Sequence, residues 1–300
     1  RPPGAAGPLP PSPPPPVAAE PAPPPADPLA TAEKAAAKLR EAAANGARLV
    51  IFPEALVGGY PKGASFGAPI GMRKPEGREA FARYHAAAID LDGPEVALLA
   101  EASAETGAFA VIGVIERDGA TLYCTALYFD GEKGLVGKHR KLMPTAGERL
   151  IWGFGDGSTL PVFKTEMGTI GAVICWENYM PALRMHMYHQ GVSLYCAPTA
   201  DDRDTWLPSM QHIALEGRTF VLTACQHITR AAYPADHESA LGDEPDLVMM
   251  RGGSAILYAR IDPAEVMRAK YDFDVTGHYA RPDVFQLSVD TRAKAAVRTE

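Results

Sequence analysis

Short apolar runs alternate along this chain with segments in which apolar residues recur at helical spacing. The apolar runs predict buried strands and lie at residues 48–54, 109–117, 169–177, 192–198 and 219–226. The segments that predict helices lie at residues 31–47, 93–108, 181–191 and 205–218. Residues 121–130 and 135–142 add a hairpin-like pair of strands around Gly131. This alternation predicts an α/β layered domain with a mixed sheet covered by helices.

Proline dominates the first segment of the chain. Residues 1–28 hold half of the 28 prolines and lack the apolar stretch that follows the charged start of a signal peptide. Because proline fixes φ and has no backbone donor, this segment cannot form a helix or a central strand. We expect a disordered or polyproline-like tail over residues 1–29, with a ligand for a proline-binding module as the alternative. One domain over residues 30–290 and a C-terminal tail over residues 291–300 complete the expected organisation.

Charge and cysteine content narrow the class of protein. A formal net charge of -7 argues against a nucleic-acid partner. No apolar run approaches the roughly 18 residues that a membrane-spanning helix requires, so no membrane segment is expected. The four cysteines, Cys124, Cys175, Cys196 and Cys225, are scattered without a CxxC pair. This usage favours a reducing cytoplasm over a disulfide-stapled secreted domain.

Three chemically active side chains, Glu54, Lys141 and Cys175, stand where apolar strands end. Sites in α/β sheets are often assembled there, because the strand fixes the side chain while the loop leaves room for a substrate. A thiol with a pKa of about 8.5 is mostly protonated at neutral pH and needs help to attack an electrophile. A carboxylate can accept its proton, and a lysine can stabilise the thiolate and the charge that develops on the substrate.

Each of the three also has a structural interpretation. A lone cysteine at a strand end is most often part of the core, as we expect for Cys124, Cys196 and Cys225. Glu54 alone would serve as a helix cap, and Lys141 within the run KHRK as a solvated surface residue. The spacing by itself leaves both interpretations open.

Longer stretches around these residues resemble one family. They are FPEALVGGYPKGASFG around Glu54, KHRKLMPTAGERLIWGFGDGS around Lys141 and GAVICWENYMPALR around Cys175. Together they resemble the nitrilase family of the carbon–nitrogen hydrolase superfamily, and the similarity extends over about residues 30–287. The stretch CWENYMP after an apolar strand looks like the nitrilase branch and unlike the amidase and carbamoylase branches.

The resemblance implies a fold, a reaction and a set of roles. The implied fold is a four-layer α-β-β-α sandwich, and the implied reaction converts a small nitrile into a carboxylic acid and ammonia without metal or organic cofactor. Cys175 is the implied nucleophile, Glu54 the general base, Lys141 the cation, and Glu148 a second glutamate that orients the others. The family also implies a homo-oligomer, a dimer or a larger spiral assembly that pairs through an outer helical layer.

Three aromatic residues are candidates for the substrate pocket. If the family layout holds, Tyr60, Trp176 and Trp206 give the pocket an apolar, aromatic lining. Ordinary core packing is the alternative for each, because aromatic side chains commonly dominate cores. Glu177, beside Cys175, is expected to be a hydrogen-bonding structural carboxylate.

Metal binding is not expected. His186 and His189 are three residues apart on a predicted helix, but no third ligand stands at a recognisable spacing. Asp201, Asp202 and Asp204 crowd one loop without the closing glutamate of an EF-hand, so we expect this loop to border the active site.

The sequence departs from the family pattern in two places. Prolines surround residues 17–19, where the family has its first strand, and RGGSAI at 251–256 runs directly into LYARID, where the family inserts a hairpin. The N-terminal strand and the late hairpin are therefore expected to be missing from the sandwich. Another carbon–nitrogen hydrolase, such as an amidase or a cyanide-converting enzyme, and a non-catalytic or damaged relative are the alternative functions.

Overall fold

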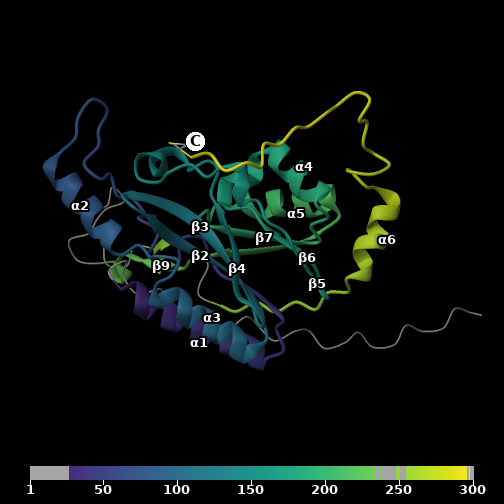
Figure 1. Ribbon diagram of the computed structural model, residues 1–300, viewed down its shortest axis with the longest axis horizontal. Coiled ribbons are helices and arrows are strands. Elements are labelled where there is room, and N and C mark those ends of the chain that lie inside the picture. Colours follow the sequence, from purple (N-terminus) through teal and green to yellow (C-terminus); the bar gives the residue numbers. More distant parts are fainter. Residues whose placement is uncertain (1–26, 234–236, 238–247, 251–254, 296, 298–300) are drawn as a thin grey trace, which may run out of the picture.

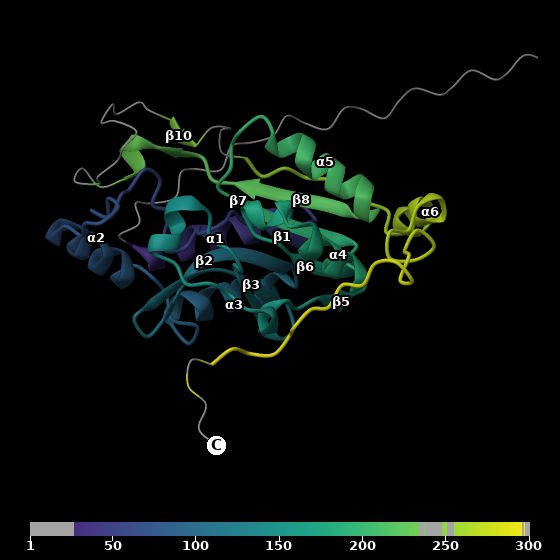
Figure 2. The ribbon, with the colours of Figure 1, turned by 90° about the horizontal axis from the view of Figure 1, so that it is seen from above.

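The predicted helices and strands stack in four layers, in the order helix, sheet, sheet, helix, as Figure 1 and Figure 2 show. The computed structural model describes residues 27–233, 237, 248–250, 255–295 and 297. The first sheet has the order β1-β2-β3-β4, formed by β1 (Leu49–Ile51), β2 (Phe109–Asp118), β3 (Thr121–Asp130) and β4 (Gly134–Arg140). The second has the order β5-β6-β7-β8, formed by β5 (Phe163–Thr165), β6 (Gly168–Ala172), β7 (Leu194–Thr199) and β8 (Phe220–Cys225). The α-β-β-α sandwich is thereby confirmed.

Each sheet is mixed, as the alternation of helices and hairpins predicted. In the first sheet β1 and β2 are parallel, and β2-β3-β4 form an antiparallel meander. In the second sheet β5 and β6 are antiparallel, whereas β6, β7 and β8 run parallel. Parallel neighbours need crossover connections, and helices supply them here.

Two pairs of helices cover the outer faces of the sandwich. Figure 1 shows α1 (Pro28–Ala44) and α3 (Pro94–Thr106) along the first sheet, and α4 (Pro181–His189) and α5 (Trp206–Gly217) along the second. The remaining elements are α2 (Pro75–Ala86), α6 (Ala264–Asp272), the antiparallel pair β9 (Ile228–Thr229) and β10 (Val248–Met250), and the short 3-10 helices η1 (Ala146–Leu150), η2 (Gly157–Thr159), η3 (Cys175–Tyr179) and η4 (Arg230–Ala232). Within the described ranges, none of the helices has the length and apolar character needed to cross a membrane.

The first helix shows how local chemistry sets an element. The side chain of Asp27 accepts a backbone hydrogen bond of the first turn, and Pro28 occupies the first helical position, where its missing N–H costs nothing. The helix ends before Gly46, whose φ of +90° is left-handed. Ala36 and Leu39 are fully buried against the neighbouring layer.

Side chains that alternate along β2 join three of the layers. Phe109, Val111 and Ile115 lie between the two sheets, and Ala110, Ile112 and Val114 face α1 and α3. A third apolar interface, with Met187, Tyr195 and Ile213, lies between the second sheet and its helices. Because a strand side chain changes face at every residue, β2 serves two interfaces at once.

Some sequence expectations are corrected. The strand predicted to run as far as Cys175 and Glu177 ends at Ala172, and Cys175 begins η3 instead. Helix α2 was not predicted, because most of its residues are exposed and its sequence has little apolar periodicity. Helix α6, with Val266 as its one buried residue, was missed for the same reason.

The expected chain ends and departures fall mostly outside the described residues. Residues 1–26, which hold most of the expected proline-rich tail and the position of the expected missing strand, lie outside them, as do residues 251–254 at the expected missing hairpin. From residue 257 to 263 the described chain contains no strand. The boundaries at residues 29, 30, 290 and 291 stay predictions.

A glycine in the middle of β2 lets one loop approach the sheet very closely. A Cβ on Gly113 would lie 2.2 Å from the carbonyl oxygen of Pro53 and 2.7 Å from the Cα of Glu54. The Gly113 carbonyl accepts the backbone N–H groups of Leu56 and Val57. The loop after β1 is therefore pressed onto β2 at the single position without a side chain.

We expect Gly113→Ala to lower the free energy of unfolding by about 1–3 kcal/mol, the usual cost of overpacking. The added methyl group has only backbone to push against, so the loop at Glu54 must move. Urea denaturation followed by circular dichroism measures the effect. Gly147→Ala is the matched control, since a Cβ there meets nothing within 4 Å. Equal midpoints for the two variants would contradict the argument.

Candidate active site

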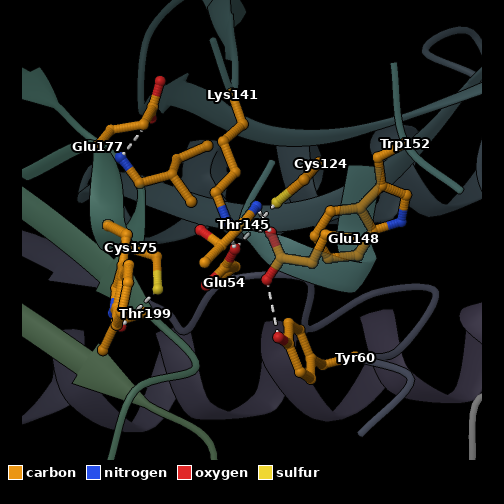
Figure 3. Close-up of polar contacts among 12 residues, drawn as sticks. Glu54, Tyr60, Cys124, Lys141, Thr145, Glu148, Trp152, Cys175, Glu177 and Thr199 are labelled. Atoms are coloured by element: carbon orange, nitrogen blue, oxygen red, sulfur yellow. Dashed lines mark hydrogen bonds and ion pairs between the residues drawn. The ribbon is translucent and has the colours of Figure 1, made fainter. Parts of the chain in front are cut away.

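A buried lysine lies at the centre of the site, between two carboxylates (Figure 3). Lys141 follows β4, and its ammonium Nζ lies 2.6 Å from Oε1 of Glu54 and 2.7 Å from Oε2 of Glu148. Lys141 and Glu54 are fully buried, and Glu148 is 9% exposed. Burial disfavours the ammonium, but the charge of Glu54 and its acidic neighbours outweighs burial and raises the pKa of Lys141 well above its usual value. Its two carboxylate partners therefore favour the charged form of the lysine.

Backbone contacts fix Glu54 in the turn after β1. Phe52 donates its N–H to Val111 on β2, and Gln226 donates its side-chain amide to the Glu54 carbonyl at 2.7 Å. Ala55, the next residue, has a left-handed φ of 50°. The carboxylate thus projects from a turn that is tied to both sheets.

One carboxylate oxygen of Glu54 is occupied and the other is free to act. Oε1 accepts from Lys141 and from the Cys124 thiol, whose Sγ lies 3.4 Å away. Among the described residues, Oε2 is buried without a hydrogen-bond partner. Burial raises the pKa of Glu54, against the opposing charge of Lys141. Oε2 is therefore the acceptor available for a proton.

Glu148 is held by three donors. Its Oε2 accepts the backbone N–H of Thr145 at 2.6 Å as well as the Lys141 ammonium, and its Oε1 accepts the Tyr60 hydroxyl at 2.7 Å. The bond from Thr145 belongs to a capping box that starts η1. Tyr60 also packs edge-to-face on Trp152, with ring centroids 5.8 Å apart.

Cys175 occupies a strained turn between β6 and η3. Its φ of 51° is left-handed, which is uncommon for a residue with a side chain, and it is 5% exposed. The side-chain amide of Asn178 donates to the carbonyls of Cys175 and Val173 and so holds the turn. Burial and the charge of Glu54 raise the pKa of the Cys175 thiol, while Lys141 opposes them. The resting group is a neutral thiol that needs a base.

Strand alternation sorts the basic run that contains Lys141. Lys138 and Arg140 both pair with Glu116. The Nζ atom of Lys138 lies 2.5 Å from Oε1, and the Nε atom of Arg140 lies 3.0 Å from Oε2. His139 and Lys141 point the other way, between the sheets, where both are fully buried. The interpretation of Lys141 as a solvated surface residue of this run is wrong.

Glu177 joins the segment that carries Lys141 to the turn that carries Cys175. Its Oε1 accepts the N–H of Leu142 at 2.6 Å, and its Oε2 accepts the N–H of Ile174 at 2.8 Å and Nε2–H of His139 at 3.0 Å. The other ring nitrogen of His139 lies 2.6 Å from the Thr159 carbonyl. Both ring nitrogens therefore face acceptors, as a protonated imidazolium requires. The expectation that Glu177 is a structural carboxylate agrees with these contacts.

The three aromatic candidates lie at different depths. Tyr60 touches Glu148 directly, as described above. Trp176 is 38% exposed and donates its indole N–H to Asp201, and the guanidinium of Arg203 stacks over its ring. Trp206, the first residue of α5, is 6% exposed and donates its indole N–H to Thr223. No contact of its ring with Glu54, Lys141 or Cys175 is found in the described part of the chain. Tyr179 stands between the two tryptophan rings.

Sequence reasoning missed several contacts of the site. Cys124, expected to be core, touches Glu54, and the Thr199 hydroxyl lies 3.2 Å from Sγ of Cys175. Both partnerships join residues far apart in the sequence, and no local pattern marks them. Across the described ranges, no cluster of three or more His, Cys, Asp and Glu side chains has a geometry that could hold a metal ion.

We expect Glu177→Gln to lower the free energy of unfolding by about 3 kcal/mol, as breaking a buried pair does. All three partners of this carboxylate are donors, so the amide nitrogen of glutamine must face one of them. Urea denaturation at pH 6.5 measures the loss. Glu166→Gln, whose side chain is 90% exposed in its pair with Arg48, is the control that should change little. A parent-like midpoint for Glu177→Gln would refute the described role.

The His139–Glu177 pair predicts a pH dependence of stability. Burial alone would lower the pKa of His139, but the charge of Glu177 and the two hydrogen bonds outweigh it and raise the pKa above 6.5. The stabilisation is then complete below about pH 6.5 and is lost as the pH rises through the raised pKa, with a slope of at most ~1.4 kcal/mol per pH unit. Unfolding free energies of the parent and of His139→Gln across this range measure it. His139→Gln should flatten the profile, and His189→Gln, at an exposed position, should not.

A family model described as carbon-nitrogen hydrolase matches residues 17–264 of the chain. A protein named nitrilase from Bradyrhizobium diazoefficiens is 70% identical over 289 residues, which cover 90% of each chain. An aliphatic nitrilase from Sinorhizobium fredii is 57% identical over 90% of this chain and 93% of its own. A bifunctional nitrilase/nitrile hydratase from Nicotiana tabacum is 52% identical over 90% of this chain and 84% of its own.

Solved structures share the fold at low sequence identity. Nit3 of Saccharomyces cerevisiae, a member of the nitrilase superfamily, aligns with a TM-score of 0.63 at 19% identity and covers 87% of this chain and 94% of its own. An amidase from Nesterenkonia sp. aligns with a TM-score of 0.53 at 18% identity, covering 69% of this chain and 73% of its own. The chain therefore belongs to the carbon–nitrogen hydrolase family, in its nitrilase branch.

Proposed function

We propose that this protein is a nitrilase that hydrolyses a small organic nitrile to a carboxylic acid and ammonia through a covalent bond to Cys175. One observation carries the proposal: a buried ammonium joins two carboxylates beside a neutral thiol on a strained turn. The high identity to proteins named nitrilase supports a nitrile as the substrate.

In the first step Oε2 of Glu54 accepts the thiol proton while Sγ of Cys175 forms a bond to the nitrile carbon. One π electron pair of the C≡N bond moves to nitrogen, which takes that proton from Oε2 of Glu54, so a thioimidate results and Glu54 is again a carboxylate. The Lys141 ammonium stabilises the charge that develops on this nitrogen, because it is preorganised and shielded from water. Glu148 and Tyr60 keep Lys141 aligned through their shared hydrogen bonds.

In the second step Glu54 removes a proton from a water molecule that adds to the thioimidate carbon. The C–N bond breaks, ammonia leaves with the transferred protons, and a thioester remains. A second water molecule cleaves the thioester to the carboxylic acid and restores the thiol. The raised pKa of Glu54 makes its carboxylate a stronger base, as a group that accepts and returns protons requires.

Tyr60 and Trp176 are the proposed substrate contacts, because Tyr60 reaches Glu148 and Trp176 follows Cys175 at the partly exposed edge of the site. Trp206 is proposed as a support for that edge through Tyr179. The names of the relatives favour an aliphatic nitrile and allow for some amide as a second product. An amidase, a cyanide-converting enzyme and a non-catalytic relative are the competing functions.

We further propose a homo-oligomer in the cytoplasm. Leu207 and Leu215 on α5 are 61% and 63% exposed, which suits a helical layer that pairs with a second copy. All four cysteines are free thiols, as a reducing compartment favours. Size-exclusion chromatography with light scattering tests the assembly.

The catalytic proposal is tested with the purified chain and a panel of aliphatic and aromatic nitriles. We expect ammonia and acid from the parent, and a loss of at least about 10⁴-fold in Cys175→Ala because the covalent route is closed. Cys196→Ala is the matched control. Burial raises the pKa of the Cys196 thiol to about 12, so this thiol stays protonated, and its removal should leave turnover intact.

Product analysis separates the competing functions. Formation of an amide without ammonia would indicate that the protein only hydrates the nitrile. Faster release of ammonia from amides than from nitriles would indicate an amidase. A folded parent that releases ammonia from neither class would refute the catalytic proposal and favour a non-catalytic relative. A cooperative melt of each variant confirms that the folded protein was measured.

A further inference from the structure

The hydroxyl of Thr199, at the end of β7, contacts the sulfur of Cys175, which follows the neighbouring strand β6. Thr199 ends β7 and is fully buried, and its Oγ1 lies 3.2 Å from Sγ (Figure 3). The same oxygen accepts the backbone N–H of Asp201 at 2.9 Å. The hydroxyl thus accepts from Asp201 and donates its single hydrogen to the sulfur of Cys175.

Two further groups favour the thiolate. The backbone amide of Ala200 and the charge of Lys141 both act to lower the pKa of the Cys175 thiol. Against them stand burial and the charge of Glu54, which raise the pKa of the thiol. In a water-excluded site a thiolate without donors would be costly, so each donor to it matters for the reaction.

We propose that Thr199 is a catalytic residue. Its hydroxyl group donates a hydrogen bond to the Cys175 sulfur and stabilises the thiolate whenever negative charge develops on that sulfur. This inference rests on the proposed role of Cys175 as nucleophile.

The donor acts twice in the reaction. As the thiol proton passes to Oε2 of Glu54, the electron pair left on Sγ is stabilised by Thr199 until the S–C bond forms. When the thioester breaks down, the C–S electron pair returns to sulfur, and Thr199 stabilises this leaving thiolate until Glu54 gives back a proton. Thr199 itself neither gains nor loses a proton in either step.

A control on another strand separates a purely structural role of the Thr199 hydroxyl from the proposed stabilisation of the sulfur. Thr165, at the end of β5, makes the same turn bond: it accepts the N–H of Met167 at 3.1 Å and donates to the carbonyl of Gly168 at 2.8 Å. Thr165→Val therefore removes the same kind of hydroxyl and the same kind of turn bond without touching the sulfur.

The experiment measures how fast iodoacetamide alkylates Cys175, using intact mass and peptide mapping at pH 7.5. In this reaction the sulfur pair forms the new S–C bond and iodide leaves, so the rate reports the nucleophile without any nitrile. We expect Thr199→Val to lower the second-order rate by about 10- to 100-fold, the effect of losing a hydrogen bond to a charged group. Thr199→Ser and Thr165→Val should stay within about threefold of the parent.

The outcomes decide between the possibilities. A parent-like rate in Thr199→Val, or an equal loss in Thr199→Ser, would overturn the inference. If Thr199→Val melts early, Thr199→Ala carries the same comparison with a smaller side chain. A parent whose Cys175 resists alkylation and that hydrolyses no nitrile would refute the proposed function itself, a pattern distinct from a reactive parent with an unaffected Thr199→Val.

Discussion

The whole site depends on keeping one ammonium group, that of Lys141, out of water. A lone buried cation would be too costly, so carboxylates must lie within hydrogen-bond distance, and Glu54 and Glu148 do so from separate segments. Those carboxylates in turn need rigid supports, which the packing of the Glu54 turn on Gly113 and the capping box at Thr145 provide. Much of the local backbone architecture thus follows from one buried charge.

The sandwich places these groups because its two sheets contribute different halves of the chemistry. The first sheet and its loops carry the ion pairs, while the second carries the thiol and the donors around it. Glu177 joins the halves through backbone and imidazole hydrogen bonds. Relative movement of the sheets would therefore separate base from nucleophile, and the buried contacts between them resist it.

The strand ends were enough to find Glu54, Lys141 and Cys175 as candidates. The alternation of strands and helices predicted an α/β layered domain with a mixed sheet, and the second sheet needed the resemblance. Glu148 needed the resemblance, because a glutamate in a short 3-10 turn has no periodic signal. Thr199 and Cys124 escaped detection, since their partners lie 24 and 70 residues away in the chain. Such pairings depend on the order of the strands within each sheet, which no local pattern encodes.

The side chains from Lys138 to Lys141 point alternately to opposite faces of the sheet, and this limits which changes in the gene the protein can tolerate. Its side chains reach two different sets of carboxylates only because consecutive residues of β4 face opposite ways. Loss of one codon within this strand would shift the register by one position and send each cation toward the other set. Single-codon deletions inside the strand are therefore incompatible with the site, so we expect the length of this strand to be kept even where its sequence varies.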